Sequence, residues 1–171
     1  MKHRIVFPLF LVCLGFASFV FAESVIKLGV VTKPGSAQNI VAEKFSELLK
    51  EKSANTFTVK IYHSQSLGNE TEILQQVQMG TIQMAVATAG PFDTFDPIVR
   101  AVNYPFLFKD EKQADQMLDG KFGDEILKSL ETSNFKGLCF SENGFRNLTN
   151  NKKPVVSPSD IRGLKIRVMS S

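Results

Sequence analysis

The chain has 171 residues, of which 43% are hydrophobic and 22% are charged. That length and apolar content are enough to bury a core, and they exclude a disordered or low-complexity chain. Lysine and arginine number 20 against 17 acidic residues, but two of the basic residues lie in the first four positions, and the rest of the chain carries a net charge of only +1. A charge balance this even excludes the strongly basic surface of a nucleic-acid-binding protein.

The first 22 residues have the pattern of a secretory signal peptide. Lys2 and Arg4 precede the almost wholly apolar run 5–21, and Val-Phe-Ala over 20–22 offers a cleavage site with a small final residue. The apolar run is too short for a spanning helix, and no stop-transfer pattern follows it. We therefore expect cleavage after Ala22, export to the periplasm, and a mature chain that does not span the membrane.

Cleavage would leave one cysteine, Cys139, and one histidine, His63. An internal disulfide and a histidine-rich zinc site are then excluded, and a Cys-His nucleophile pair would require these two residues to meet by chance. The apolar neighbours of Cys139 predict that it is a small core residue. Nucleophile-elbow, zinc-protease and phosphate-loop motifs are absent from the sequence, so we expect no cofactor and no metal.

The mature chain begins with a strand, a helix and a second strand. Residues 25–32 (VIKLGVVT) form a β-branched apolar run that predicts a strand ended by Lys-Pro-Gly. Ser36 is a good N-cap, and apolar residues recur at helical spacing from there through Lys52. Apolar and polar residues alternate over 57–62, which predicts a half-buried strand.

A second helix and a third strand continue this alternation. Asn69 is a further N-cap candidate, and Glu72 three residues later completes a capping-box pattern. Gly80 ends that helix, and residues 84–87 (MAVA) predict a short buried strand. The order β-α-β-α-β predicts an α/β fold with a parallel sheet and helices on its faces.

After residue 87 the pattern changes, which indicates passage into a second lobe. The predicted elements of this part are a loop over 88–97, helices over 111–118 and 122–130, a strand over 138–140, one helical turn over 157–160 and a strand over 164–169. We expect a two-lobed α/β protein with a signal peptide over 1–22, lobe I over 23–135, and the start of an incomplete lobe II over 136–171.

Three phenylalanines lie in loop-rich sequence: Phe92, Phe95 and Phe106. They could pack in the core or line a pocket. Core packing is the favoured interpretation, and pocket lining stays open as the alternative.

Two arginines are candidates for binding an anion. Arg146 and Arg167 each lie where an apolar run meets turn residues, in or beside a predicted strand that could hold the side chain rigidly. A guanidinium offers a fixed fork of donors that matches a carboxylate with two hydrogen bonds, which a lysine cannot do. Our hypothesis is that this pair clamps a small organic acid. The alternative is that both are ordinary surface arginines with solvated heads.

The predicted sheet offers a second indication of an anion site. Ligands of open parallel sheets bind beyond the carboxyl ends of the strands. In this chain those ends carry residues 33–38, 63–70 and 88–92. Two of them lead directly into helix N-termini, whose free N–H groups and positive dipole favour an anion. This agrees with the arginine hypothesis, although the feature is common among α/β proteins.

Several stretches then carry a specific resemblance. They are VIKLGVVTKPGSAQN with AEKFSELLKEKS, SLGNETEILQQVQMGTIQMA, NYPFLFKD, ENGFRNLTN and SPSDIRGLKIRVM, in order over essentially the whole mature chain. In these stretches the chain resembles the solute-binding proteins of tripartite ATP-independent periplasmic (TRAP) transporters, of the DctP type. The resemblance implies the two-lobed fold of periplasmic binding proteins, with the first lobe largely present and the second truncated.

The resemblance also implies site residues. Arg167, in GLKIRV, corresponds to the main carboxylate clamp of the family, and Arg146, in NGFRN, to a position that adds a second contact or orients the first. Glu70 is similar to a family residue near the cleft that contacts the ligand directly or through water, and a charge at a helix N-terminus is the alternative role. By analogy, five more residues lie in cleft-facing loops: Lys33, Gln38, Thr88, Ala89 and Phe92.

The function implied by the resemblance is transport and not catalysis. Such a protein captures a small organic acid, such as a C4-dicarboxylate, another carboxylic acid or a sugar acid, and hands it to membrane permease subunits driven by an ion gradient. One alternative is a periplasmic ligand-binding module of an ABC importer or a sensory receptor. Another is an exported hydrolase that uses serine, lysine or a carboxylate dyad, although the sequence shows no nucleophile-base constellation.

One departure from the family concerns length. The resemblance implies a mature chain about twice as long, with a complete second lobe and a later asparagine region that completes the pocket. The part of lobe II present here, residues 136–171, is too short to bury its own core. We therefore expect residues 23–171 alone to bind ligand poorly or not at all.

Overall fold

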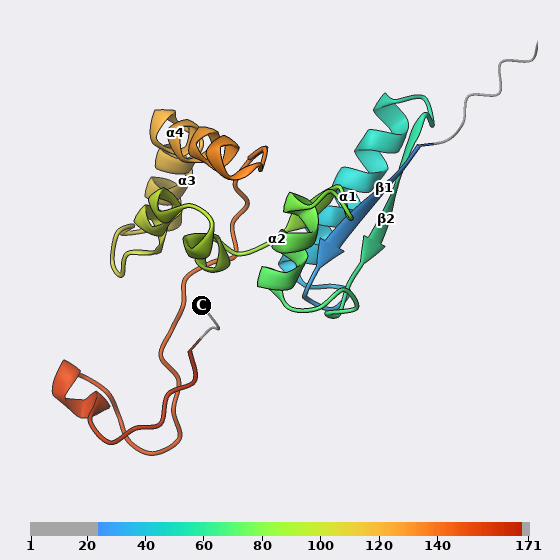
Figure 1. Ribbon diagram of the computed structural model, residues 1–171. Helices are drawn as coiled ribbons and strands as arrows, with labels where there is room; N and C mark the ends of the chain where they lie inside the picture. Colours follow the sequence, from blue (N-terminus) through green and yellow to red (C-terminus); the bar gives the residue numbers. More distant parts are fainter. Residues whose placement is uncertain (1–23, 169–171) are drawn as a thin grey trace, which may run out of the picture.

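The computed structural model describes residues 24–168. Its first elements are β1 (Ser24–Val30), α1 (Ala37–Lys52), β2 (Phe57–Tyr62), α2 (Glu70–Gln78) and β3 (Met84–Val86). The strands form one parallel sheet in the order β2-β1-β3, seen on the right of Figure 1. The prediction of a parallel α/β fold is confirmed. The predicted signal peptide and its cleavage site lie outside the described residues.

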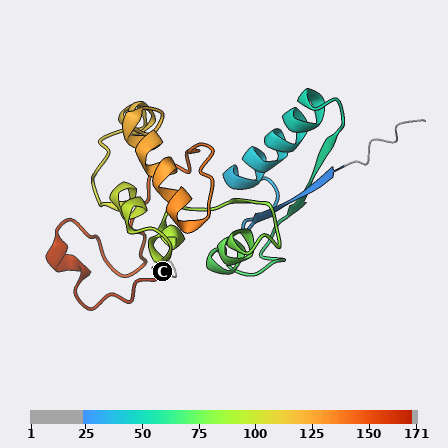
Figure 2. The same ribbon diagram turned by 45° about the horizontal axis from the view of Figure 1, so that its top comes forward.

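The sheet is covered on both faces, as a parallel sheet requires. On one face, Leu28 and Val30 of β1 pack against Ala42 of α1. Gly29 faces the other side, where a β-carbon would approach the Cγ2 atom of Ile73 in α2 to 2.8 Å. Figure 2 shows α1 and α2 on opposite sides of the strands. The close approach of β1 to α2 therefore depends on glycine at position 29.

Both helices begin with the predicted caps. The Ser36 side chain accepts from the Asn39 backbone N–H at the start of α1. At the start of α2, Asn69 and Glu72 form a reciprocal capping box, with distances of 3.0 and 2.8 Å between the bonded atoms. Such caps satisfy N–H groups that the first helical turn leaves free. They fix both helix N-termini at the carboxyl edge of the sheet.

A second core lies beyond β3, among short helices. These are the 3₁₀ helices η1 (Gly90–Thr94) and η2 (Pro97–Asn103), then α3 (Glu111–Leu118), α4 (Lys121–Ser129) and the 3₁₀ helix η3 (Leu130–Ser133). The buried residues of this core are Leu74, Val99, Ile126, Leu130 and Phe135. Leu74 belongs to α2, so the second core joins the short helices to the sheet.

The three loop phenylalanines differ in their positions. Phe92 and Phe95 pack against the second core, each edge-to-face with Phe135 at centroid distances of 5.5 and 5.3 Å. The favoured prediction of core packing is confirmed for these two. It is wrong for Phe106, which is fully exposed. Phe106 has a φ of +62°, in a turn closed by a hydrogen bond from the backbone N–H of Leu107, and this turn carries its ring away from the core.

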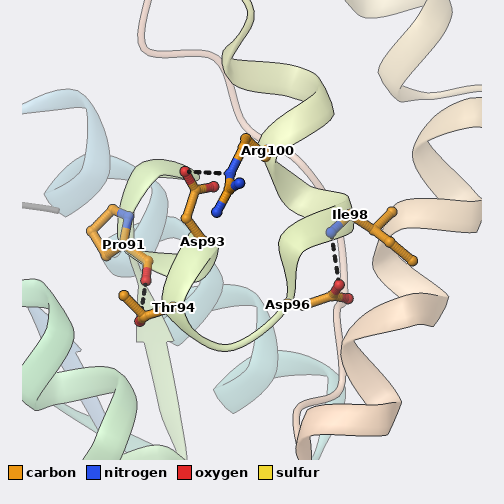
Figure 3. A network of polar contacts seen from close by, with 6 residues as sticks. All are labelled: Pro91, Asp93, Thr94, Asp96, Ile98 and Arg100. Atoms are coloured by element: carbon orange, nitrogen blue, oxygen red, sulfur yellow. Dashed lines mark hydrogen bonds and ion pairs between the residues drawn. The ribbon is translucent and has the colours of Figure 1, made fainter.

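A buried carboxylate, Asp96, ties the 3₁₀ helices to α4. Figure 3 shows its contact with Ile98 inside η2. Asp96 is only 4% exposed, and its oxygens accept from the Ile98 backbone N–H at 2.9 Å and from the Ser129 hydroxyl. Asp93 and Arg100 add an ion pair at 3.4 Å. A buried carboxylate is tolerated only with such partners, so this network fixes how η1 and η2 lie against α4.

Residues 136–168 run mostly as an extended segment that leaves the short helices (Figures 1 and 2). Its one regular turn is the 3₁₀ helix η4 (Pro158–Ile161), which confirms the predicted helical turn. The Ser157 hydroxyl and the backbone N–H groups of Val156 and Ser157 donate to Asp160 and hold the pKa of that carboxyl below its usual value.

Two expectations for this segment are wrong. The predicted strands over 138–140 and 164–169 do not form in its described part, and Cys139 is exposed and not a core residue. A strand needs a neighbour to complete its ladder of hydrogen bonds, and no segment within 24–168 pairs with either stretch. Of the two apolar neighbours of Cys139, Leu138 is exposed and Phe140 packs against the second core.

Candidate functional site

Three of the predicted ligand residues meet at the carboxyl edge of the sheet. Glu70 Oε1 accepts from the Thr88 backbone N–H at 2.9 Å and from Gln38 Nε2 at 3.3 Å. Glu70 Oε2 accepts from the Thr88 hydroxyl at 2.7 Å. We call Gln38, Glu70 and Thr88 the edge cluster.

The parallel topology explains why these residues come together. Gln38 lies in the first turn of α1, Glu70 is the first residue of α2, and Thr88 follows the end of β3. Parallel strands end at the same edge, so the residues that follow them converge there. The sequence suggested each residue by analogy but gave no sign of their contact, because Gln38 and Glu70 are 32 residues apart.

Gln38 carries an unusual feature for a buried side chain. The residue is 7% exposed, and its amide oxygen has no hydrogen-bond partner among the described residues. Flipping the Gln38 side-chain amide would place its oxygen against the Glu70 carboxylate, which also offers only acceptors. The hydrogen bond to Glu70 therefore fixes the orientation of the amide. The edge cluster therefore contains one buried acceptor that is not satisfied.

The other three predicted ligand residues before residue 136 do not join this cluster. Ala89 follows Thr88 directly, and both Ala89 and Phe92 pack against the second core. Lys33 is exposed, and its backbone carbonyl accepts from the Ser36 N–H at 3.2 Å in the turn before α1. Within residues 24–168, the Lys33 side chain forms no ion pair.

The two arginines lie elsewhere in this structure. Arg146 and Arg167 are both exposed on the extended segment. In the part of the chain that the structure describes, no side-chain hydrogen bond or ion pair joins either of them to the edge cluster. The structure thus brings Gln38, Glu70 and Thr88 together and does not bring the arginines to them.

Two surface hollows lie away from the predicted ligand residues. A hollow of about 450 Å³ is lined by Lys109, Asp110, Glu111, Lys112 and Phe145, where the extended segment passes the start of α3. Nearby, partial desolvation and the charges of Glu111 and Asp115 raise the pKa of Glu142. A second hollow, of about 340 Å³, lies between α4 and residues 136–138. Neither contains a predicted ligand residue.

The described residues offer no metal-ligating group of three or more histidine, cysteine, aspartate or glutamate side chains. No helix within 24–168 is long and apolar enough to cross a membrane.

Comparison with known proteins identifies a family. The model of the DctP family, described as bacterial extracellular solute-binding protein, family 7, matches residues 28–171. The 2,3-diketo-L-gulonate-binding periplasmic protein YiaO of Escherichia coli K12 is 36% identical over all of this chain and 53% of its own length. The chain thus spans about half the length of such relatives.

Solved structures agree with this assignment. A TRAP periplasmic solute-binding protein from Ochrobactrum anthropi is 39% identical, with a TM-score of 0.80 over 88% of this chain and 47% of that one. Another such protein, from Polaromonas sp. JS666, is bound to D-erythronate and is 34% identical to this chain. Its TM-score is 0.82 over 86% of this chain and 48% of that one. Both the fold and the sequence therefore match proteins of this class.

Proposed function

Since the chain belongs to the bacterial extracellular solute-binding proteins of family 7, the DctP family, we propose that its native protein captures a small organic acid and delivers it to the permease of a TRAP transporter. The family consists of solute-binding proteins and not of enzymes, in agreement with the prediction from sequence.

The family match over residues 28–171 carries this proposal, because it includes the stretches around both Arg146 and Arg167. Two relatives bind 2,3-diketo-L-gulonate and D-erythronate, which are both carboxylic acids with hydroxyl groups. A guanidinium is the side chain best suited to hold such a carboxylate. Arg167 is the proposed main clamp, and Arg146 supports it.

The proposed mechanism is hinge closure around the acid. Residues 23–135 form lobe I, with the edge cluster at its binding edge, and residues 136–171 begin lobe II, which carries both arginines. Closure removes the ligand carboxylate from water, and this is tolerable only because an arginine pairs with it. Lys33 and Ala89 complete the lobe I side of the cleft in this proposal. Phe92 joins them with the part of its side chain that packing against the second core leaves exposed.

The test is a thermal melt of the native gene product with a panel of acids at saturating concentration. The panel holds succinate, malate, lactate, pyruvate, a sialic acid and D-erythronate, with erythritol as the uncharged control. A ligand at about 100 times its dissociation constant stabilises the folded state by roughly 2.7 kcal/mol. We expect at least one acid to raise Tm by several degrees while erythritol does not. A flat response to every acid would contradict carboxylate capture.

Delivery to a TRAP permease has its own test. Genes for the small and large membrane subunits of a TRAP transporter should lie beside this gene. If genes for an ABC importer or a sensory receptor lie beside this gene instead, they would favour the alternative hypothesis, in which this binding protein serves one of those partners.

Export to the periplasm is also proposed, from the signal peptide pattern of residues 1–22. We expect the protein recovered from the periplasm to begin at Glu23. Mass spectrometry of its N-terminal peptide checks this, and a protein that retains residues 1–22 in the cytoplasmic fraction would overturn it.

A further inference from the structure

The one Asn-Gly pair of the sequence, Asn143 and Gly144, lies on the extended segment (Figure 1). Both residues are exposed, and neither belongs to a helix or a strand. Gly144 has a φ of +72°, and a β-carbon built on it would meet nothing within 4 Å. The space around the peptide group that joins the two residues is therefore open.

The N–H of this peptide group is not held by the fold. Within residues 24–168, the Gly144 N–H donates no backbone hydrogen bond. In a helix or a sheet, such a bond would keep the group engaged. Asparagine side chains approach backbone groups close to them in sequence, and glycine has no side chain to obstruct the approach. The Gly144 nitrogen can therefore reach the Cγ atom of Asn143.

That approach allows a reaction that needs only water. The Gly144 nitrogen loses its proton and attacks Cγ of Asn143. A bond between these two atoms forms, the bond from Cγ to the side-chain nitrogen breaks, and ammonia leaves with a proton from water. Water then opens the cyclic imide at either carbonyl, giving aspartate or isoaspartate. In total, one water is consumed and one ammonia is released, without an oxidant or a reductant.

We propose that Asn143 is a site of spontaneous deamidation and that the new carboxylate weakens ligand binding at Arg146. Arg146 lies three residues further along the chain, so the two Cα atoms are at most about 11 Å apart. The new carboxylate attracts the guanidinium and repels the carboxylate of the ligand. The isoaspartate product also adds an atom to the main chain before Arg146 and displaces that side chain. The effect on binding rests on the proposed function, whereas the modification does not.

Ageing of the purified native gene product tests the modification. Matched samples are incubated in mildly alkaline and mildly acidic buffer and analysed by peptide mass spectrometry. We expect the peptide with Asn143 to change from amide to acid, faster in the alkaline buffer, and to separate into two isomers. Asn147 is the internal control, because it is exposed on the same segment but is followed by Leu148. It should react at least about 10-fold more slowly, since the leucine side chain obstructs ring closure and glycine does not.

Calorimetric titration of the same samples tests the effect on binding, with the acid that raises Tm most. We expect alkaline ageing to lower the affinity at least about twofold at low ionic strength, and added salt to reduce this Coulombic loss. Asn143→Asp should show the loss without ageing. Asn143→Gln keeps an amide on a longer side chain that disfavours ring closure, so its affinity should survive ageing. Asn55→Asp adds the same charge on the exposed loop between α1 and β2 and should leave affinity unchanged.

The outcomes separate the inference from the proposed function. An Asn143 that stays unmodified, or that reacts no faster than Asn147, would overturn the modification site. Modified wild type and Asn143→Asp that bind as tightly as fresh wild type would overturn the effect on binding. The comparison of fresh with aged wild type needs no variant to fold. If fresh protein bound no acid, the proposed function and the effect on binding would both fail, while mass spectrometry would still decide the modification.

Discussion

Replacing Arg167 with alanine should lower the affinity of the native gene product for its organic acid at least about 100-fold, which corresponds to about 2.7 kcal/mol. In the proposed closed state the ligand carboxylate is desolvated against this guanidinium. Removing one partner of a buried, hydrogen-bonded charge pair typically costs about 2–5 kcal/mol, because the other charge stays buried and unpaired. Isothermal titration with the acid that raises Tm most would measure the loss.

Two further variants separate a specific clamp from general positive charge. Arg167→Lys keeps the charge and loses the planar fork, so we expect it to recover only part of the affinity. Arg162→Ala removes an exposed arginine five residues earlier on the same segment and should leave affinity within about twofold of wild type, because it lies outside the proposed clamp. If Arg162→Ala and Arg167→Ala weakened binding equally, the clamp assignment would be wrong.

We expect residues 23–171 produced alone to bind organic acids no more tightly than about 1 mM, because binding would first have to order an extended segment. Arg146 and Arg167 are exposed on a segment whose only regular turn is η4. Bringing them to the edge cluster would require that segment to become fixed without strand partners. Calorimetric titrations of residues 23–171 with the same panel of acids would measure the affinity.

The control for this comparison is the fold of the isolated chain. The sheet and the short helices have their own buried cores, so residues 23–171 should still show a cooperative melt. A cooperative melt with no binding would agree with the expectation. A dissociation constant of about 1 μM or tighter would contradict it and would mean that the sheet, the short helices and the segment suffice.

The sequence by itself determined the elements of the sheet. The predicted starts of α1 and α2 are those observed, because Ser36 and the Asn69–Glu72 capping box act within one helical turn. The strands follow from runs of alternating or β-branched residues, whose periodicity is also local. The family follows from motifs that keep their order along the chain.

Only the tertiary structure decided which of the candidate residues meet. Contact between Gln38, Glu70 and Thr88 depends on three strands ending at one edge, and no short-range pattern records this. The same limit explains the errors at Phe106, at Cys139 and in the two predicted strands of the extended segment. An apolar pattern states only a preference for burial or pairing. Whether a residue is buried or paired depends on a partner elsewhere in the chain, because a strand's hydrogen bonds and a core's contacts are non-local.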